Sequence, residues 1–343
     1  MNPSATPPGK SNYVDPTPIM ELATAYWASA TLLAANELGI FSPLARGPKP
    51  LDALAADLHA DPRGLRLLLD ACCGLGLLKH TPDGYALTPA SAQYLVPGKP
   101  GTLGTAISWA QDQYAMWGRL AHSVRTGLPA AAPAEHLGTD PQQTRTFVLA
   151  MRERALGMAR AVVRFMDLEE CRRLLDVGGG PGAYARLLVE QYPKLHVTIL
   201  DLPGVAAIAQ ELIAEDGLAH RITVMPGDAT LGEYGAGHYD AVLFSGVLHQ
   251  MSEQNVRKML GGAHRSLTAG GRVVVSDVML DETRSQPAFA ALFSLQMLLS
   301  TAEGQVFTEG DLACWLEAAG FRNISVRRLP PPLPYTVVHA AKP

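Results

Sequence analysis

Three acidic side chains lie at the ends of short apolar runs, where they could bind hydroxyl and amine groups of a ligand. Asp176 lies two residues before the first glycine of the turn GGGPG, Asp201 follows the run VTIL, and Asp228 follows ITVMPG. A carboxylate after a second strand suits ribose hydroxyls, and one after a third can accept a hydrogen bond from an adenine amine. An acid beneath the turn attracts a cation and repels a pyrophosphate. The spacing therefore indicates a site for a nucleoside-like ligand with a positive charge.

The glycines of the turn give the ligand room. Glycine adopts positive φ readily, and a side chain at Gly178 or Gly180 would hold the backbone away from a ligand. Together with Ala183, these glycines also satisfy the fingerprint of dinucleotide-binding proteins. The turn alone therefore leaves a nicotinamide dinucleotide, or an ordinary tight turn with no ligand, as alternatives.

The stretch Arg173 to Val205 positions these groups. Leu174–Val177 predicts a strand, Ala183–Gln191 predicts a helix that ends at Tyr192–Pro193, and Val197–Leu200 predicts the next strand. Strand, glycine turn, helix and strand form a βαβ unit, whose ligand crevice lies at the carboxyl ends of its strands.

A histidine and a fourth acid follow later strands. His249 comes after the apolar run Val242–Phe244, and Asp277 ends the run VVVSD. We expect both strand ends at the same crevice. An imidazole can take a proton from a hydroxyl near neutral pH, and a carboxylate can orient the ring through its other nitrogen. Either residue can also be an ordinary loop or capping residue.

Composition narrows the class of protein. The 343 residues are 48% hydrophobic, enough for two domains, and the net charge of −4 gives no general attraction to nucleic acid or an anionic membrane. Residues 1–15 do not form a signal peptide, and the apolar run 288–299 is too short to span a bilayer. We expect a cytoplasmic protein, since the four cysteines contain no CxxC motif and fit a reducing compartment best. These cysteines are Cys72, Cys73, Cys171 and Cys314. We expect no metal, because no cluster of acids and histidines has ligand spacing.

The N-terminal region predicts helices followed by a hairpin. Residues Ile19 to Leu44 have helical spacing and little polar surface, which indicates burial, in this chain or in a second subunit. Asp61–Pro62 begins another helix, and KHTPDGYALT contains a Pro-Asp-Gly turn between short extended pieces. Helix, helix and hairpin form a winged-helix arrangement.

A winged helix raises the alternative of a DNA-binding regulator. Residues 1–105 hold seven Lys or Arg against eight Asp or Glu, and the candidate recognition helix offers only Arg63 and Arg66. A protein that binds the phosphates of DNA needs a basic face. A packing role is therefore the better interpretation of this region.

The order of these motifs resembles a known family. The glycine loop, the ribose acid, the adenine acid, the strand YDAVLFSGVLH and an L-x-x-GG turn in LTAGG follow each other as in S-adenosylmethionine-dependent methyltransferases. The central region is similar to the plant-type small-molecule O-methyltransferases and their bacterial relatives, through a pattern of nine residues. These are Trp117, Leu120, Val124, Thr126, Gly127, Pro129, Phe147, Ala150 and Met151.

The resemblance implies an α/β fold in two domains. A Rossmann-like methyltransferase domain, with a parallel sheet and a terminal antiparallel hairpin from NISVRRL and YTVVHAAK, follows a mostly helical winged-helix dimerisation domain. We expect a tail at 1–15, the dimerisation domain at 16–105, linker helices that wall the acceptor pocket at 106–167, and the S-adenosylmethionine-binding domain at 168–343. The chain would form a homodimer through its N-terminal domain.

The resemblance also implies roles for residues. His249 would be the general base for methyl transfer to a hydroxyl of a small aromatic metabolite, beside Asp277. S-adenosylmethionine, with S-adenosylhomocysteine as product, would be bound by one set of residues and the acceptor by another. The cofactor set is Asp176, Gly178, Gly180, Asp201, Leu202, Gly227, Asp228, Ala229 and Ser245. The acceptor set is Trp117, Met151, Gln296 and Met297.

The chain departs from the family pattern near the base. Gln250 and Met251 replace the Asp and Trp that follow the histidine, and Val306 and Phe307 replace the Glu and Arg of the motif G-G-x-E-R-T. That Glu is a second acid beside the base in the family. An alternative function is therefore a non-methylating enzyme or scaffold that keeps the cofactor site. The acids that could substitute are Glu303 and Glu309.

Overall fold

The structure is a computed structural model that describes residues 14–130, 140–331 and 333–343. The chain divides into two compact units, Met1–Pro97 and Gly98–Pro343. The domain boundaries predicted at residues 15, 105 and 167 stay predictions.

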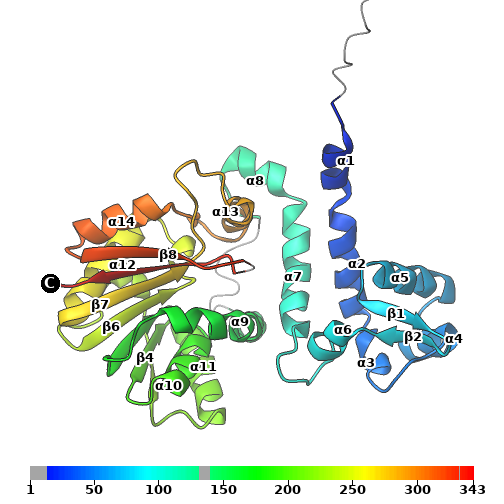
Figure 1. Cartoon of the computed structure of the whole chain (residues 1–343), viewed down its shortest axis with the longest axis horizontal. Helices are drawn as coiled ribbons and strands as arrows, with labels where there is room; N and C mark the ends of the chain where they lie inside the picture. The colour runs from blue at the N-terminus through cyan, green and yellow to red at the C-terminus, as the bar shows by residue number, and fades with distance from the viewer. Residues whose placement is uncertain (1–13, 131–139, 332) are drawn as a thin grey trace, which may run out of the picture. The chain divides into compact units, whose positions relative to one another are not determined.

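The N-terminal unit contains short helices and one hairpin (Figure 1). Its elements are α1 Thr17–Thr24, α2 Tyr26–Glu37, α3 Phe41–Leu44, α4 Leu51–Leu58, α5 Pro62–Gly74, β1 Leu78–Thr81, β2 Gly84–Leu87 and α6 Pro89–Tyr94. The hairpin is confirmed, with Lys79 opposite Ala86. The start of α5 is confirmed too, because the Asp61 side chain accepts a hydrogen bond from Gly64 N at 2.8 Å.

The helix predicted over residues 19–44 is wrong in its continuity. Three helices replace it: α1 ends at Thr24, and α2 is separated from α3 because Gly39 adopts φ +68° and the chain turns there. No residue of α1 is buried. Large apolar side chains on α1 and α2 remain exposed, among them Leu22 at 78% and Trp27 at 60%.

The second unit is built on a seven-stranded sheet in the order β5-β4-β3-β6-β7-β9-β8. The strands are β3 Arg173–Val177, β4 His196–Asp201, β5 Ile222–Pro226, β6 Tyr239–Ser245, β7 Leu267–Asp277, β8 Arg322–Arg328 and β9 Thr336–Ala341. Strands β3 to β7 pair in parallel, and β8 and β9 form the predicted antiparallel hairpin. The expected Rossmann-like sheet is confirmed. The LTAGG segment, expected as a turn, instead forms the start of β7.

Helices cover both faces of this sheet (Figure 1). Those of the unit are α7 Gly104–Trp117, α8 Leu120–Thr126, α9 Pro141–Val162, α10 Ala183–Gln191, α11 Pro203–Glu215, α12 Glu253–Ser266, α13 Ala288–Ser300 and α14 Glu309–Ala318. Helices α10 and α11 pack with α9 and with β4 and β5, whereas α12 packs with β7 and α14. The three-layer arrangement buries both faces of the parallel strands.

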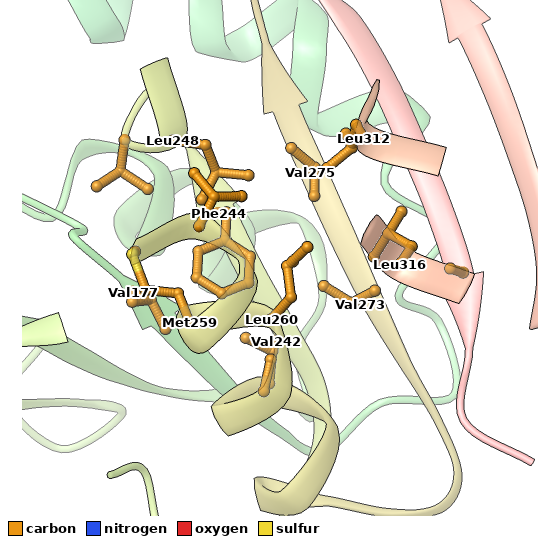
Figure 2. Packing of buried hydrophobic residues seen from close by; sticks show 14 of the residues in the cluster. Val177, Val242, Phe244, Leu248, Met259, Leu260, Val273, Val275, Leu312 and Leu316 are labelled. Carbon is orange, nitrogen blue, oxygen red and sulfur yellow. The ribbon is translucent and has the colours of Figure 1, made fainter. Parts of the chain in front are cut away.

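Successive side chains of each strand point to opposite faces of the sheet, so the core has one half on each face. Phe244 and Val242 of β6 lie toward α12, and Val275 of β7 lies toward Leu312 and Leu316 of α14 (Figure 2). All five side chains are at most 3% exposed, and each contributes about 1.5–3 kcal/mol by burial. This packing fixes where each strand ends and which face its last residues present.

The connections place a crevice between two particular loops. From β3 the chain moves to β4 and β5 on one side, then crosses to β6 on the other side of β3. Where the connections from neighbouring strands run in opposite directions, ligands bind at the carboxyl ends. The glycine turn after β3 and residues 246–250 after β6 therefore flank the crevice.

Candidate active site

Asp176 is a buried carboxylate beneath the glycine turn. A Cβ at Gly179 would lie 2.7 Å from its Cγ, so the turn packs directly on the side chain. Asp176 is 0% exposed, and neither carboxylate oxygen has a hydrogen-bond partner in the described part of the chain. Burial, aided by the nearby charge of Asp201, raises its pKa to about 7. A cationic ligand group would relieve this cost.

Asp201 ties the turn to the end of β4. Its Oδ2 accepts a hydrogen bond from Gly180 N and its Oδ1 accepts one from Leu202 N, both at 2.8 Å. Burial raises the pKa of this carboxyl, and the two backbone N–H groups partly oppose that effect. Each oxygen keeps a further lone pair for a ligand hydroxyl.

The glycines of the turn serve two different purposes. A Cβ at Gly180 would meet nothing within 4 Å, so this position leaves open space, as expected for a ligand. A Cβ at Gly178 would come within 2.5 Å of Val247 Cγ2, a side chain of this protein. Gly178 is therefore also needed so that the loop after β6 can pack against the turn, and its role toward a ligand stays a prediction.

Strand β5, which leads into the predicted cofactor residues Gly227, Asp228 and Ala229, ends beside Asp201. Gly227 N donates to the Asp201 carbonyl at 2.8 Å, and buried Ala229 follows shortly after. Asp228 is exposed, and its Oδ1 accepts from Thr230 N and Thr230 Oγ1. The second oxygen of Asp228 stays available for an amine.

Ser245 completes this edge of the sheet at the end of β6. It lies in register with Ser276 of β7. Gly246 N donates to the Ser276 carbonyl at 2.9 Å, which extends the pairing past the end of β6. The structure thus lines up the ends of β3, β4, β5 and β6 along one crevice.

His249 and Asp277 form a hydrogen-bonded pair at the same edge. The Nδ1 atom of His249 lies 2.6 Å from Asp277 Oδ1, and that oxygen also accepts a hydrogen bond from Val278 N at 2.8 Å. The two residues are 9% and 3% exposed. Because the carboxylate accepts from Nδ1, the lone pair of the imidazole is at Nε2. The geometry can orient a base.

Sequence reasoning missed the aromatic wall beside this pair. Phe293 of α13 packs edge-on against the His249 ring, with centroids 4.8 Å apart and planes at 72°. Phe289, one turn earlier, stacks on Phe293 at 5.9 Å. Their spacing of four residues on an apolar helix was the available signal, but it does not reveal which element the rings contact.

Two of the four predicted acceptor residues meet. Trp117 Nε1 donates to Gln296 Oε1 at 2.6 Å, which joins α7 to α13. Met297, next along α13, is buried. Met151 is half-buried on α9, a helix that packs against α7. The structure also adds Gln113, which accepts from Gln296 Nε2.

The positions that depart from the family pattern are apolar and packed. Val306 is 1% exposed in a cluster with Val278 and Leu280, and the Phe307 ring contacts the Trp315 ring at 4.8 Å. Glu309 is paired with Arg328 at 2.6 Å. Glu303 is exposed. Among the described residues, the ion pair of His249 is with Asp277 and not with either of these acids. Gln250 Nε2 donates to the Gly246 carbonyl at 3.2 Å.

Neither a metal site nor a membrane-spanning helix is found among the described residues. Within residues 14–130, 140–331 and 333–343, no group of three or more His, Cys, Asp or Glu side chains could hold a metal ion. No helix among the same residues is long and apolar enough to cross a membrane. The cytoplasmic location stays a prediction.

The sheet topology, the glycine turn and the acids at the strand ends define a methyltransferase that uses S-adenosylmethionine. The family model of the O-methyltransferase domain matches residues 117–322, and the model of the O-methyltransferase dimerisation domain matches residues 20–97. The chain belongs to the O-methyltransferase family. The resemblance inferred from the motifs is confirmed.

Individual relatives agree with this assignment. The 3-hydroxy-5-methyl-1-naphthoate 3-O-methyltransferase of Streptomyces sahachiroi is 35% identical over 99% of this chain and 98% of its own length. The tetracenomycin polyketide synthesis 8-O-methyl transferase TcmO of Streptomyces glaucescens is 31% identical over 90% and 92%. The structure of human N-acetylserotonin methyltransferase in complex with S-adenosylmethionine has a TM-score of 0.86 at 29% identity, covering 97% of this chain and 99% of that one.

Proposed function

We propose that this chain transfers a methyl group from S-adenosylmethionine to a hydroxyl of a small aromatic acceptor, with His249 as general base. The observation that carries the proposal is the 2.6 Å contact of His249 Nδ1 with Asp277 at the crevice edge. His249 lies beyond the end of β6 and Asp277 is the last residue of β7. Strand β6 neighbours β3, which leads into the glycine turn.

The chain offers a matching group for each part of the cofactor. The orphaned carboxylate of Asp176 fits the cationic methionine end, Asp201 fits the ribose hydroxyls, and Asp228 fits the adenine amine. Open space at Gly180 leaves room for its backbone to approach the ligand. When bound, S-adenosylmethionine supplies an electrophilic methyl group on a sulfonium.

The residues beside the acceptor perform the proton chemistry. His249 Nε2 takes the proton of the acceptor hydroxyl, so that the oxygen reacts with more negative charge. Asp277 holds Nδ1–H and stabilises the imidazolium that forms. Phe293 packs on the imidazole and limits the access of water. Fixing the acceptor oxygen close to the methyl group supplies much of the remaining rate enhancement.

Acceptors are best sought among fused phenols. The relatives from Streptomyces are named for a hydroxynaphthoate and for a tetracenomycin polyketide, and aromatic side chains line α13 beside His249. Incubation with S-adenosylmethionine carrying a trideuterated methyl group and a panel of hydroxynaphthoates and polycyclic phenols tests the proposal. We expect a labelled methyl ether in the mass spectrum. Tight cofactor binding without any methylated product would contradict methyl transfer.

That contradictory result would favour a second function, a scaffold or non-methylating enzyme that keeps the cofactor site. The observation in its favour is the apolar packing of Val306 and Phe307 where the family pattern has Glu and Arg. In the described residues, Asp277 is then the acid that contacts His249. One oriented imidazole is sufficient for a general base, so methyl transfer remains our proposal.

We further propose that the chain works as a homodimer through its N-terminal unit. Exposed Ile19, Leu22 and Trp27 on α1 and α2 form an apolar surface of the kind that obligate interfaces bury. The dimerisation-domain model covers Leu22 and Trp27. Sedimentation at micromolar concentration should give a dimer. A monomer under these conditions would contradict the proposal.

A further inference from the structure

A chain of three side chains links α7 and α13 beside the proposed acceptor site. Trp117 Nε1 donates to Gln296 Oε1, and Gln296 Nε2 donates to Gln113 Oε1. The remaining polar atom of these three side chains, Gln113 Nε2, is buried and has no hydrogen-bond partner in the described part of the protein. A donor at this position calls for an acceptor atom that the described residues do not supply.

The indole of Trp117 fixes the direction of both hydrogen bonds between these three side chains. An indole nitrogen can only donate, so Gln296 must turn its oxygen toward Trp117 and its NH₂ group away. That NH₂ group can only donate, so Gln113 must turn its oxygen toward Gln296. The atom that Gln113 presents beyond the chain is therefore a donor, although amide oxygen and nitrogen are otherwise easily exchanged.

The contacts of α13 with His249 and with Gln113 come from neighbouring positions of the same helix. Phe293, which packs on His249, and Gln296, which holds Gln113, are three residues apart on α13. Side chains at this spacing share one face of a helix, with roughly 5–6 Å between their Cβ atoms. An aromatic ring system that places its hydroxyl at His249 can thus place a second oxygen near Gln113.

We propose that Gln113 Nε2 donates a hydrogen bond to a carbonyl or carboxylate oxygen of the acceptor and so selects hydroxyarenes that carry such a group. This inference rests on the proposed function, because it takes the region beside His249 as the acceptor site. A buried donor left without a partner is costly, so an acceptor that lacks the oxygen binds less well. The neutral amide serves either a carboxylate or an uncharged carbonyl.

The test compares three acceptors that differ only in the substituent at one ring position, which is a hydrogen, a carboxylate or a methyl ester. They are 2-naphthol, 3-hydroxy-1-naphthoate and methyl 3-hydroxy-1-naphthoate. Their affinities for the full-length protein are measured by calorimetry in the presence of S-adenosylhomocysteine, and methyl transfer is measured separately. We expect the wild-type protein to bind one or both oxygen-bearing acceptors about tenfold more tightly than 2-naphthol. The tighter of the two shows whether a carboxylate or an uncharged carbonyl is preferred.

Variants assign this preference to Gln113. In Gln113→Leu the ratio of affinities should fall close to one, whereas Gln254→Leu, a matched change on the exposed side of α12, should keep the wild-type ratio. Trp117→Phe keeps an aromatic ring but removes the N–H that fixes both amides, so it should also lower the ratio. Thermal melting of each variant checks that it is folded at the temperature of the measurement, so that the ratios describe folded protein.

Three outcomes would overturn the inference: no preference in the wild-type protein, an undiminished preference in Gln113→Leu, or an undiminished preference in Trp117→Phe. Failure of the proposed function would look different. In that case no acceptor would be methylated, while a preference that depends on Gln113 in the calorimetric measurements would still support the hydrogen bond.

Discussion

Asp176 and Asp277 are two buried acids at the carboxyl ends of parallel strands, yet their surroundings differ. Asp277 accepts hydrogen bonds from His249 Nδ1 and Val278 N through one oxygen. Asp176 has no partner among the described residues, and burial raises its pKa to about 7. One acid already orients a neighbouring base, whereas the other has a charge that only a ligand can offset. The difference predicts a division of work between acceptor chemistry and cofactor binding.

The largest expected effect is on the rate of methyl transfer, when His249, the partner of Asp277, is replaced. His249→Ala should lower kcat for methyl transfer by about 10²–10⁴-fold, the usual contribution of a general base. The affinity for S-adenosylmethionine should hardly change, because the imidazole is held by Asp277 and packs on Phe293 rather than on the glycine turn. Steady-state rates and cofactor calorimetry check both parts. A near-normal rate would mean that another base acts or that proximity suffices.

A pH effect should appear on the side of Asp176. Its pKa is raised on folding, so between about pH 4 and 7 the folded, cofactor-free protein binds a proton that the unfolded chain has lost. Stability should therefore fall as the pH rises through this window. Asp176→Asn should remove that part of the pH dependence. At pH 8 its free energy of unfolding should exceed that of the wild-type protein by up to about 4 kcal/mol.

Urea unfolding at pH 5 and pH 8 measures this effect. Asp52→Asn, which changes an exposed carboxylate in the first turn of α4, is the control and should keep the wild-type pH dependence. If Asp176→Asn also keeps it, Asp176 does not carry the buried charge that the comparison with Asp277 requires.

A smaller effect is expected at Asp201. Asp201→Ala should weaken S-adenosylmethionine binding by about 1–3 kcal/mol, because ligand hydroxyls lose a charged acceptor. Asp201 also fastens Gly180 and Leu202, so Asp201→Asn, which keeps one acceptor oxygen, should lose less. Calorimetry orders the three proteins. Equal affinity in Asp201→Ala and wild type would remove Asp201 from the cofactor site.

Features encoded by neighbouring residues could be predicted from the sequence. The strand, glycine turn and helix that follow one another from Arg173 need only local patterns. The meeting of His249 with Asp277 could also be predicted, since His249 follows β6, Asp277 ends β7, and these two parallel strands end at a common edge.

Contacts between distant helices could not be predicted in the same way. Gln113 and Gln296 are 183 residues apart, and no local pattern shows which face α13 turns toward α7. The clash that keeps Gly178 a glycine involves Val247 from another loop. Continuity failed at residues 19–44 for a related reason, because apolar spacing extends through Gly39 although the backbone there leaves the helix.

The most direct test measures cofactor affinity and methyl-transfer rate together in Asp176→Asn and Asp277→Asn. We expect Asp176→Asn to weaken S-adenosylmethionine binding, since its carboxylate offers the unpaired charge. Asp277→Asn should bind the cofactor normally but react more slowly at saturating cofactor, with a smaller loss than His249→Ala, because it disturbs only the orientation of the base. Slow methyl transfer with unaltered cofactor affinity in Asp176→Asn, or weakened cofactor binding in Asp277→Asn, would contradict the division of work between the two acids.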